Sequence, residues 1–261
     1  MSSLDDAYAN APYIAGAEHY HGRWQAEAAE MRARLGDRAL LGLSYGPSER
    51  QAFDLFLPTG APKGTVIFVH GGYWLKFDRS YWSHLARGPL EQGWAVAMPS
   101  YDLCPEVRIA TITQQIALAV QKIAARQAGP ISLTGHSAGG HLVARMCAPG
   151  MLPNQIRQRL HHVMPISGLS DLEPLLQTEM NTEFGMDLEM ARAESPLLQP
   201  APDLPVTLWV GGAERPSFLD QTFWLSEAWS CPQIVAPHKH HFDVIDALAD
   251  PDSDMVARLT R

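Results

Sequence analysis

Residues 135–139 constrain this chain more than any other stretch. They read Gly-His-Ser-Ala-Gly and stand between an apolar run at 131–134 and a helix-like segment at 140–146. A serine in a glycine-flanked turn between a strand and a helix is the pattern of a nucleophile elbow, whose strained backbone exposes the hydroxyl. The start of the following helix places backbone N–H groups beside that hydroxyl. We therefore predict that Ser137 is a nucleophile and that Ala138 supplies an N–H to an oxyanion.

A second glycine-rich turn lies upstream, at residues 70–74, and reads His-Gly-Gly-Tyr-Trp directly after the apolar run 65–69. Glycines in such a turn let main-chain N–H groups face a substrate carbonyl. Because a strand precedes this turn and the elbow follows downstream, the two motifs support each other. We predict an oxyanion hole built from Gly71, Gly72 and Tyr73 together with the elbow, and a structural role for His70.

Apolar runs and helix-like segments alternate along the chain. This order predicts a mostly parallel sheet with helices on both faces, an α/β fold. With no repeat and no internal boundary, we expect one domain over 1–261, with a helical arm at about 1–38 and a lid-like insertion at about 170–203. The expected strands are 40–45, 52–57, 65–69, 94–98, 131–134, 162–167, 206–210 and 233–236, and the expected helices include 22–35, 80–92, 109–123, 140–146, 217–227, 242–248 and 254–259.

Composition excludes several classes of partner. The chain of 261 residues has a net charge of −8 and no basic run, so we expect no nucleic-acid partner. No apolar segment is long enough to span a bilayer, and no signal peptide is expected. The three cysteines show no metal-ligand spacing, so we interpret them as reduced thiols. These features predict a cytoplasmic protein that acts on a small molecule, away from membranes.

A serine nucleophile needs a base, and the base needs an orienting carboxylate. On sheets that carry such an elbow, the chain order is serine, acid, histidine. The acid should follow the penultimate strand, and Glu214 stands in a glycine-containing turn directly after 206–210. Asp220 is the alternative acid, although it falls within the expected helix 217–227. Ser100, Ser132 and Ser167, near strand ends, are the alternatives to the elbow serine.

The base should follow the last strand, where His238, His240 and His241 cluster. We select His241 because it directly precedes the final helical segment, and we keep His240 as the alternative. Three clustered histidines also suggest a metal site, but no acidic or cysteine ligand stands at a suitable spacing. We therefore expect neither a metal nor another cofactor.

Four motifs together resemble the kynurenine formamidase (arylformamidase) branch of the α/β-hydrolase superfamily, which is close to lipase- and esterase-type hydrolases. They are the sequences at 70–74, 135–141, 212–214 and 241–243. Trp74 is typical of that branch, whereas related esterases more often carry a third glycine in this loop. The resemblance implies an α/β-hydrolase fold with Ser137, Glu214 and His241 as a triad. Some members carry aspartate where this chain has Glu214.

The resemblance implies a metal-independent serine hydrolase that cleaves an aryl formamide of the N-formylkynurenine type. The alternative is a carboxylesterase acting on small aryl or short-acyl esters. A third hypothesis, a catalytically silent binding module, conflicts with the complete set of nucleophile, acid, base and oxyanion loop. Because esterase-like relatives often pair, the resemblance also admits a homodimer.

Overall fold

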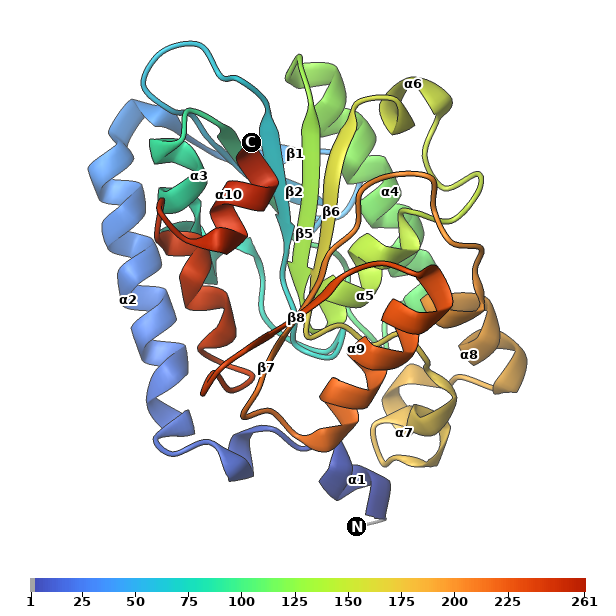
Figure 1. Ribbon diagram of the computed structural model, residues 1–261. Coiled ribbons are helices and arrows are strands. Elements are labelled where there is room, and N and C mark those ends of the chain that lie inside the picture. The colour runs from blue at the N-terminus through green and yellow to red at the C-terminus, as the bar shows by residue number, and fades with distance from the viewer. Residues whose placement is uncertain (1–2) are drawn as a thin grey trace.

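Eight strands form one sheet in the order β1-β2-β4-β3-β5-β6-β7-β8 (Figure 1). The computed structural model describes residues 3–261. Its strands are β1 (Ala39–Ser44), β2 (Ala52–Phe56), β3 (Thr65–Val69), β4 (Ala95–Pro99), β5 (Ile131–His136), β6 (Leu160–Ile166), β7 (Leu208–Gly211) and β8 (Gln233–Ala236). The strand β2 pairs antiparallel with β1 and with β4, and every other neighbouring pair is parallel. The predicted mostly parallel sheet is confirmed.

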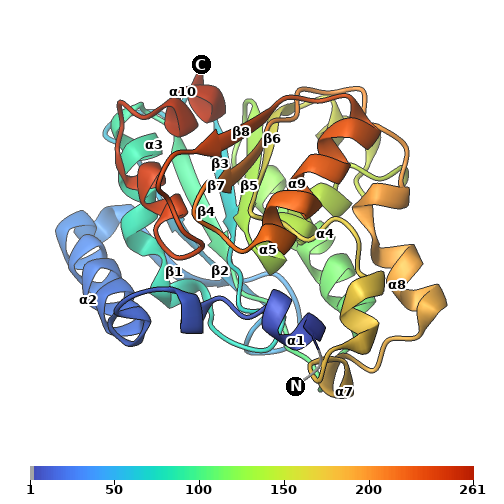
Figure 2. The ribbon, with the colours of Figure 1, turned by 60° about the horizontal axis from the view of Figure 1, so that its bottom comes forward.

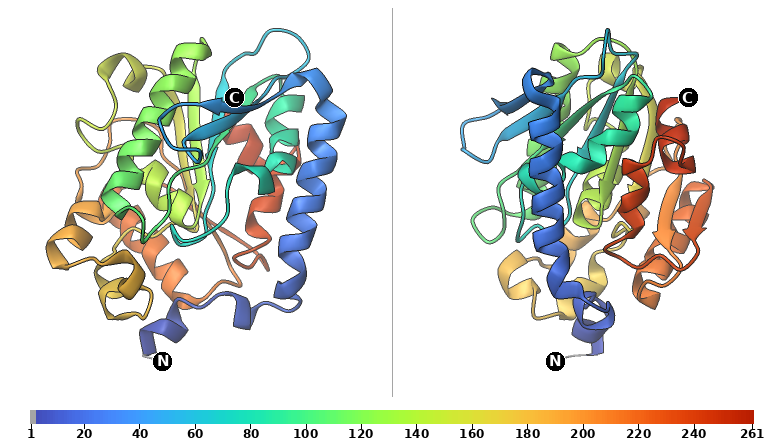
Figure 3. Two further views of the ribbon diagram at one scale, coloured as in Figure 1. Left: turned by 180° about the vertical axis from the view of Figure 1, so that it is seen from behind. Right: turned by 90° about the vertical axis from the view of Figure 1, so that its left-hand side faces the viewer.

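Helices cover both faces of this sheet, as Figures 2 and 3 show. Alternate side chains of a strand point to opposite faces. In β3, Val66 and Phe68 pack in the cluster that contains α2 (Ala17–Leu35), α3 (Arg87–Glu91) and α10 (Asp254–Thr260). Ile67 and Val69 pack in the other cluster, whose helices are α4 (Ile109–Arg126), α5 (Ala138–Arg145) and α9 (Pro216–Trp229). The central strands are therefore apolar on both sides.

The prediction of a single helix over 80–92 is wrong. The stretch instead forms two 3₁₀ turns, η3 (Arg79–Tyr81) and η4 (Ser83–Ala86), followed by the short helix α3. Pro89 has no N–H, and its ring would clash with the carbonyl four residues earlier, so a continuous α-helix cannot pass through it. Residues 242–248 also differ from expectation, because the regular structure there is a 3₁₀ helix, η7 (Val244–Ala249).

The stretch 170–203 lies on the α4 side of the sheet, beside α9 (Figure 1). It forms η5 (Glu173–Gln177), α7 (Asn181–Phe184), α8 (Leu188–Glu194) and η6 (Pro196–Leu198). The buried Glu194 anchors it to the body, since its carboxylate accepts bonds from Thr113 (2.6 Å) and from Arg145 (3.2 Å).

The first described residues lie at the end of the molecule where the parallel strands end. They form α1 (Ser3–Ala7) and the turn η1 (Ala11–Tyr13), after which α2 runs along the side of the sheet (Figure 1). The remaining short elements are η2 (Gly36–Arg38) and α6 (Asn154–Arg157). Within residues 3–261, no helix combines the length and apolar character that crossing a bilayer requires.

Candidate active site

Ser137 occupies a sharp turn between β5 and α5, as predicted. Its backbone has φ +56° and ψ −119°, a strained combination for a residue with a side chain. Its N–H donates to the Ile166 carbonyl at 2.9 Å. The turn is crowded, because a Cβ on Gly139 would lie 2.0 Å from the Val69 carbonyl oxygen, and one on Gly135 would lie 2.4 Å from that of Gly139. Only glycine fits at either position.

The three alternative serines all use their hydroxyls elsewhere. Ser100 Oγ accepts the Arg79 N–H at 2.9 Å, and Ser132 Oγ donates to the Leu259 carbonyl at 2.7 Å. Ser167 Oγ donates to Glu214 at 2.5 Å. Each of these hydroxyls holds part of the framework, which leaves Ser137 as the candidate nucleophile.

The loop after β3 lies against the elbow. A Cβ on Gly71 would stand 2.9 Å from Ser137 Cβ, so glycine permits this approach. The next residues, Gly72, Tyr73 and Trp74, all have positive φ, at +104°, +52° and +57°. For the two aromatic residues this region costs roughly 1–2 kcal/mol each. Two hydrogen bonds hold the loop in this strained conformation. Tyr73 Oη donates to the Tyr8 carbonyl at 2.7 Å, and the Trp74 carbonyl accepts a backbone N–H at 2.8 Å.

His70 is buried beneath this loop. Its ring stacks on Tyr101 with 4.3 Å between ring centroids, and Tyr101 Oη donates to the His70 carbonyl at 2.9 Å. Burial lowers the pKa of His70 to about 4, so the imidazole is neutral at neutral pH. This environment fits the structural role expected from the sequence.

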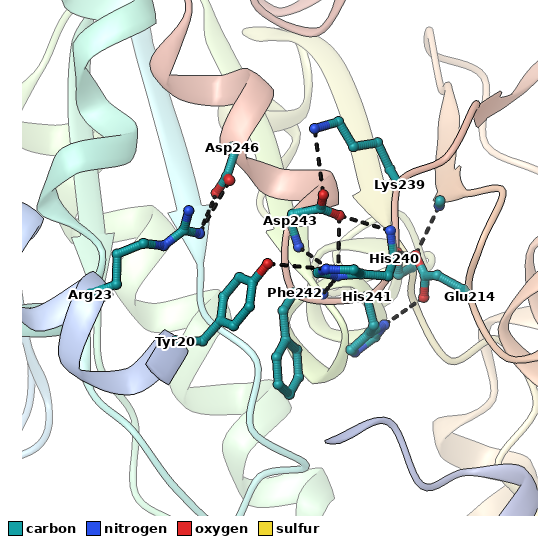
Figure 4. Close-up of polar contacts among 11 residues, drawn as sticks. Tyr20, Arg23, Glu214, Lys239, His240, His241, Phe242, Asp243 and Asp246 are labelled. Carbon is teal, nitrogen blue, oxygen red and sulfur yellow. Dashed lines mark hydrogen bonds and ion pairs between the residues drawn. The ribbon is translucent and has the colours of Figure 1, made fainter. Parts of the chain in front are cut away.

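Glu214 and His241 meet at the carboxyl ends of β7 and β8 (Figure 4). His241 Nδ1 and Glu214 Oε2 are 2.5 Å apart. The other carboxylate oxygen, Oε1, accepts the Ser167 hydroxyl at 2.5 Å and the Gly211 N–H at 2.8 Å. The Glu214 side chain is fully buried. Its carboxylate is held by three partners, His241, Ser167 and Gly211. A glutamate can therefore reach the imidazole from this turn.

The alternative acid and base lie elsewhere. Asp220 is exposed on α9. His240 turns away from Glu214 in Figure 4, with Nε2 3.0 Å from Tyr20 Oη and Nδ1 accepting the Asp243 N–H at 3.3 Å. No cluster of three or more metal-ligating side chains is found in the part of the chain that the structure describes.

Two aromatic rings hold the His241 imidazole. The Phe218 ring lies 4.4 Å from it and the His136 ring 4.6 Å, measured between centroids. Burial, reinforced by the neighbouring His241, lowers the pKa of His136 well below its usual value, so His136 packs as a neutral ring.

Sequence reasoning missed the contacts of His136, Phe218 and Ser167 with the candidate acid and base. The sequence offers Ser167 only as an alternative nucleophile, but its position directly after the parallel strand β6 places it at the same sheet edge as Glu214.

Comparisons with known proteins agree with this architecture. A family model described as BD-FAE matches residues 53–195. Kynurenine formamidase of Salmo salar is 26% identical over 88% of this chain and 84% of its own length, and that of Drosophila melanogaster is 28% identical over 96% and 89%. A crystal structure from Silicibacter sp. TM1040, provisionally described as a thioesterase, is 60% identical over 99% of both chains, with a TM-score of 0.98. Esterase B of Lactobacillus rhamnosus superposes with a TM-score of 0.67 at 20% identity, covering 94% of this chain and 92% of its own. The chain has the α/β-hydrolase fold, and it is a hydrolase.

Proposed function

The chain belongs to the BD-FAE family, and from this premise we propose that it is a serine hydrolase that works through an acyl-enzyme intermediate. The observation that carries the mechanism is the contact between His241 Nδ1 and Glu214 Oε2. It lies at the sheet edge that also carries the strained Ser137. An imidazole held at one nitrogen by a buried carboxylate is oriented to act as a base through its other nitrogen.

The steps follow from this arrangement. Ser137 Oγ attacks the substrate carbonyl while His241 accepts the hydroxyl proton, and Glu214 stabilises the imidazolium that forms. Main-chain N–H groups of the 71–73 loop and of Ala138 bind the developing oxyanion. His241 then returns the proton to the leaving group, and a water molecule, activated in the same way, releases the acyl group.

We assign an aryl formamide of the N-formylkynurenine type as the preferred substrate. Support comes from the kynurenine formamidases, which align over 84–89% of their own length. An aniline is a better leaving group than an alkyl amine, so a serine hydrolase can expel it once His241 donates a proton. Formyl is the smallest acyl group and needs little room beside the Tyr73–Trp74 turn.

Cleavage of an ester or thioester is the second candidate. The description of the 60% identical relative as a thioesterase favours it. The same nucleophile, base and oxyanion hole serve formamides, esters and thioesters, so the three classes of acyl donor must be compared directly.

The test is kcat/KM on three substrates whose leaving groups carry the same phenyl ring: formanilide, phenyl acetate and S-phenyl thioacetate, which release aniline, phenol and thiophenol. N-formylkynurenine is assayed beside them, and a fluorophosphonate probe reports whether Ser137 is reactive. We expect labelling of Ser137 and turnover of both formamides. Labelling of Ser137 with turnover of the ester or thioester, but of neither formamide, would support the serine mechanism and contradict the formamide assignment. Failure of the wild type to react with the probe would overturn the mechanism itself.

A further inference from the structure

A cavity of about 240 Å³ lies beside His241 and Glu214. Three segments far apart in the chain line it. The turn after β7 and the turn after β8 supply the acid and the base, and residues 10–14 of the N-terminal segment form the third wall. The lining residues are Asn10, Tyr13, Ile14, Ala213, Glu214, Arg215, Pro216, His240 and His241.

The position of this cavity indicates which part of the substrate it receives. In acyl transfer the base that activates the nucleophile also protonates the leaving group, so the leaving group departs on the side of that base. The cavity adjoins His241, the proposed base. A cavity of about 150 Å³ is enough to bind benzene. The larger space here can hold an aromatic ring or a short polar chain attached to one.

Two buried polar atoms on the wall have no hydrogen-bond partner. Asn10 is 8% exposed, and its Oδ1 is an unpartnered acceptor. Arg215 Nε is an unpartnered donor in the same lining. Leaving such a group buried and unpaired costs roughly 1–3 kcal/mol. Both atoms are covered in the cavity as it stands, so a ligand that offers an N–H donor and an anionic acceptor satisfies them when the two side chains turn toward it.

The segment 8–14 is tied to the site by several contacts. The carbonyl of Tyr8 accepts from Tyr73 in the candidate oxyanion loop, and Tyr8 Oη accepts from Gln221 Nε2 at 2.9 Å. The Arg215 guanidinium lies 3.6 Å above the Tyr13 ring and donates to Asp6 Oδ2 at 2.8 Å. These contacts hold Asn10 against the cavity rather than in solvent.

We propose that this cavity is the leaving-group pocket and that Asn10 and Arg215 determine its specificity. The pocket takes an aromatic leaving group that carries an ammonium or amine donor and a carboxylate, as in an α-amino acid side arm. Asn10 Oδ1 accepts from the donor, and Arg215 Nε donates to the carboxylate. This inference rests on the serine-hydrolase function proposed above.

The test compares substrates with and without the polar arm. N-formylkynurenine is paired with formanilide, and O-acetyltyrosine with 4-methylphenyl acetate, so that either acyl chemistry provides a measurement. Selectivity is the ratio of kcat/KM within each pair. We expect Asn10→Leu to lower it about tenfold, and Arg215→Met to lower it about ten- to hundredfold, because the bond to a charged group is stronger.

Two controls separate this effect from damage to the fold. Asn154→Leu makes the same substitution at an exposed position on α6, at the opposite end of the molecule from α1 (Figure 1), and should leave the ratio unchanged. Asp6→Asn removes the ion pair with Arg215 but keeps the guanidinium on the Tyr13 ring, so the ratio should fall less than in Arg215→Met. Thermal unfolding of each variant confirms that it is folded.

The outcomes distinguish the two levels of the proposal. If the selectivity ratio stays the same in folded Asn10→Leu and Arg215→Met proteins, the pocket assignment is wrong. Labelling of Ser137 by the probe would still support the hydrolase function in that case. Absence of both labelling and turnover in the wild type would overturn the function and the pocket together.

Discussion

The sheet edge around Ser137 and the N-terminal segment that borders it are held by different means. At the edge, Glu214 has three buried partners, and glycines at 135 and 139 leave no space for even a methyl group. The segment 3–14 has one buried anchor, Tyr8, which is 3% exposed. Ahead of it lie exposed contacts, among them the ion pair between Asp6 and Arg215, whose side chains are 55% and 21% exposed. Surface pairs of this kind contribute about 0–1 kcal/mol.

This contrast separates chemistry from selectivity. Reacting groups must be held to within about 0.5 Å, which requires dense packing and buried hydrogen bonds. A wall that only selects among leaving groups can tolerate looser anchoring and a different sequence. The proposed reaction should therefore be sensitive to changes at the sheet edge, and the proposed substrate preference to changes in the segment.

The largest effect is expected at the elbow. Ser137→Ala should lower turnover by on the order of 10⁴-fold or more while the protein stays folded, because members of a triad act as a unit. Steady-state kinetics and circular dichroism measure the two parts. Turnover near that of the wild type would show that Ser137 is not the nucleophile and that the reaction does not depend on this sheet edge.

Glu214→Gln should come next, with a loss of about 10²- to 10⁴-fold in kcat. The amide keeps the shape of the side chain but favours the wrong imidazole tautomer. Asp220→Asn is the matched control, and since Asp220 is exposed on α9 its turnover should equal that of the wild type. A severe loss in Asp220→Asn with a mild one in Glu214→Gln would reverse the assignment.

Ser167→Ala should lower kcat by about tenfold, with KM little changed. It removes one of the two donors that hold Glu214 Oε1, and a hydrogen bond to a charged group is worth about 1.5–3 kcal/mol. The control is Ser132→Ala, which also removes a hydrogen bond from a buried hydroxyl. Ser132 lies at the start of β5, whereas the elbow follows the end of that strand. The control variant should reduce the free energy of unfolding without reducing kcat; equal kinetic losses in both variants would argue against a positioning role for Ser167.

Acid should destabilise the edge through its buried histidines. Burial lowers the pKa of His70, and of His141 in α5 just after the elbow, to about 4, whereas an unfolded histidine titrates near 6.5. The unfolded state therefore binds more protons between those values, and the free energy of unfolding should fall as pH decreases from 6.5 towards 4. The slope is about 1.4 kcal/mol per pH unit for each histidine. Urea unfolding at pH 7, 6 and 5 measures it, and a constant value from pH 7 to 5 would contradict it.

The smallest effect should come from the segment. Asp6→Asn removes a largely exposed ion pair, so the melting temperature should fall by no more than about 2–4 °C. Differential scanning calorimetry gives the shift. A collapse of the melting temperature, with loss of turnover, would show that segment and edge are one rigid unit and would erase the contrast.

What could be predicted from the sequence follows the range of the interactions. Ser137 and Gly71 stand in short motifs whose neighbours in the chain determine the backbone, and the structure has a sharp turn at Ser137 and a close approach at Gly71. Local pattern failed at 80–92, where Pro89 outweighs the apolar spacing. It was silent on Asn10, because that residue meets its cavity neighbours across more than 200 positions of the chain. Neither the pattern of apolar residues nor a short motif predicts a contact between residues so far apart in the sequence.

The placement of the chain ends has a practical consequence for preparing the protein. The first described helix, α1, lies at the end of the molecule where the parallel strands and the candidate site are, whereas α10 finishes at the opposite end (Figure 1). An affinity tag or fusion partner attached ahead of α1 would join the chain a few residues before Asp6, which pairs with Arg215 of the cavity wall. The same tag attached after Arg261 would emerge far from it. Kinetic comparisons of leaving groups should therefore use protein that carries its tag at the carboxyl end.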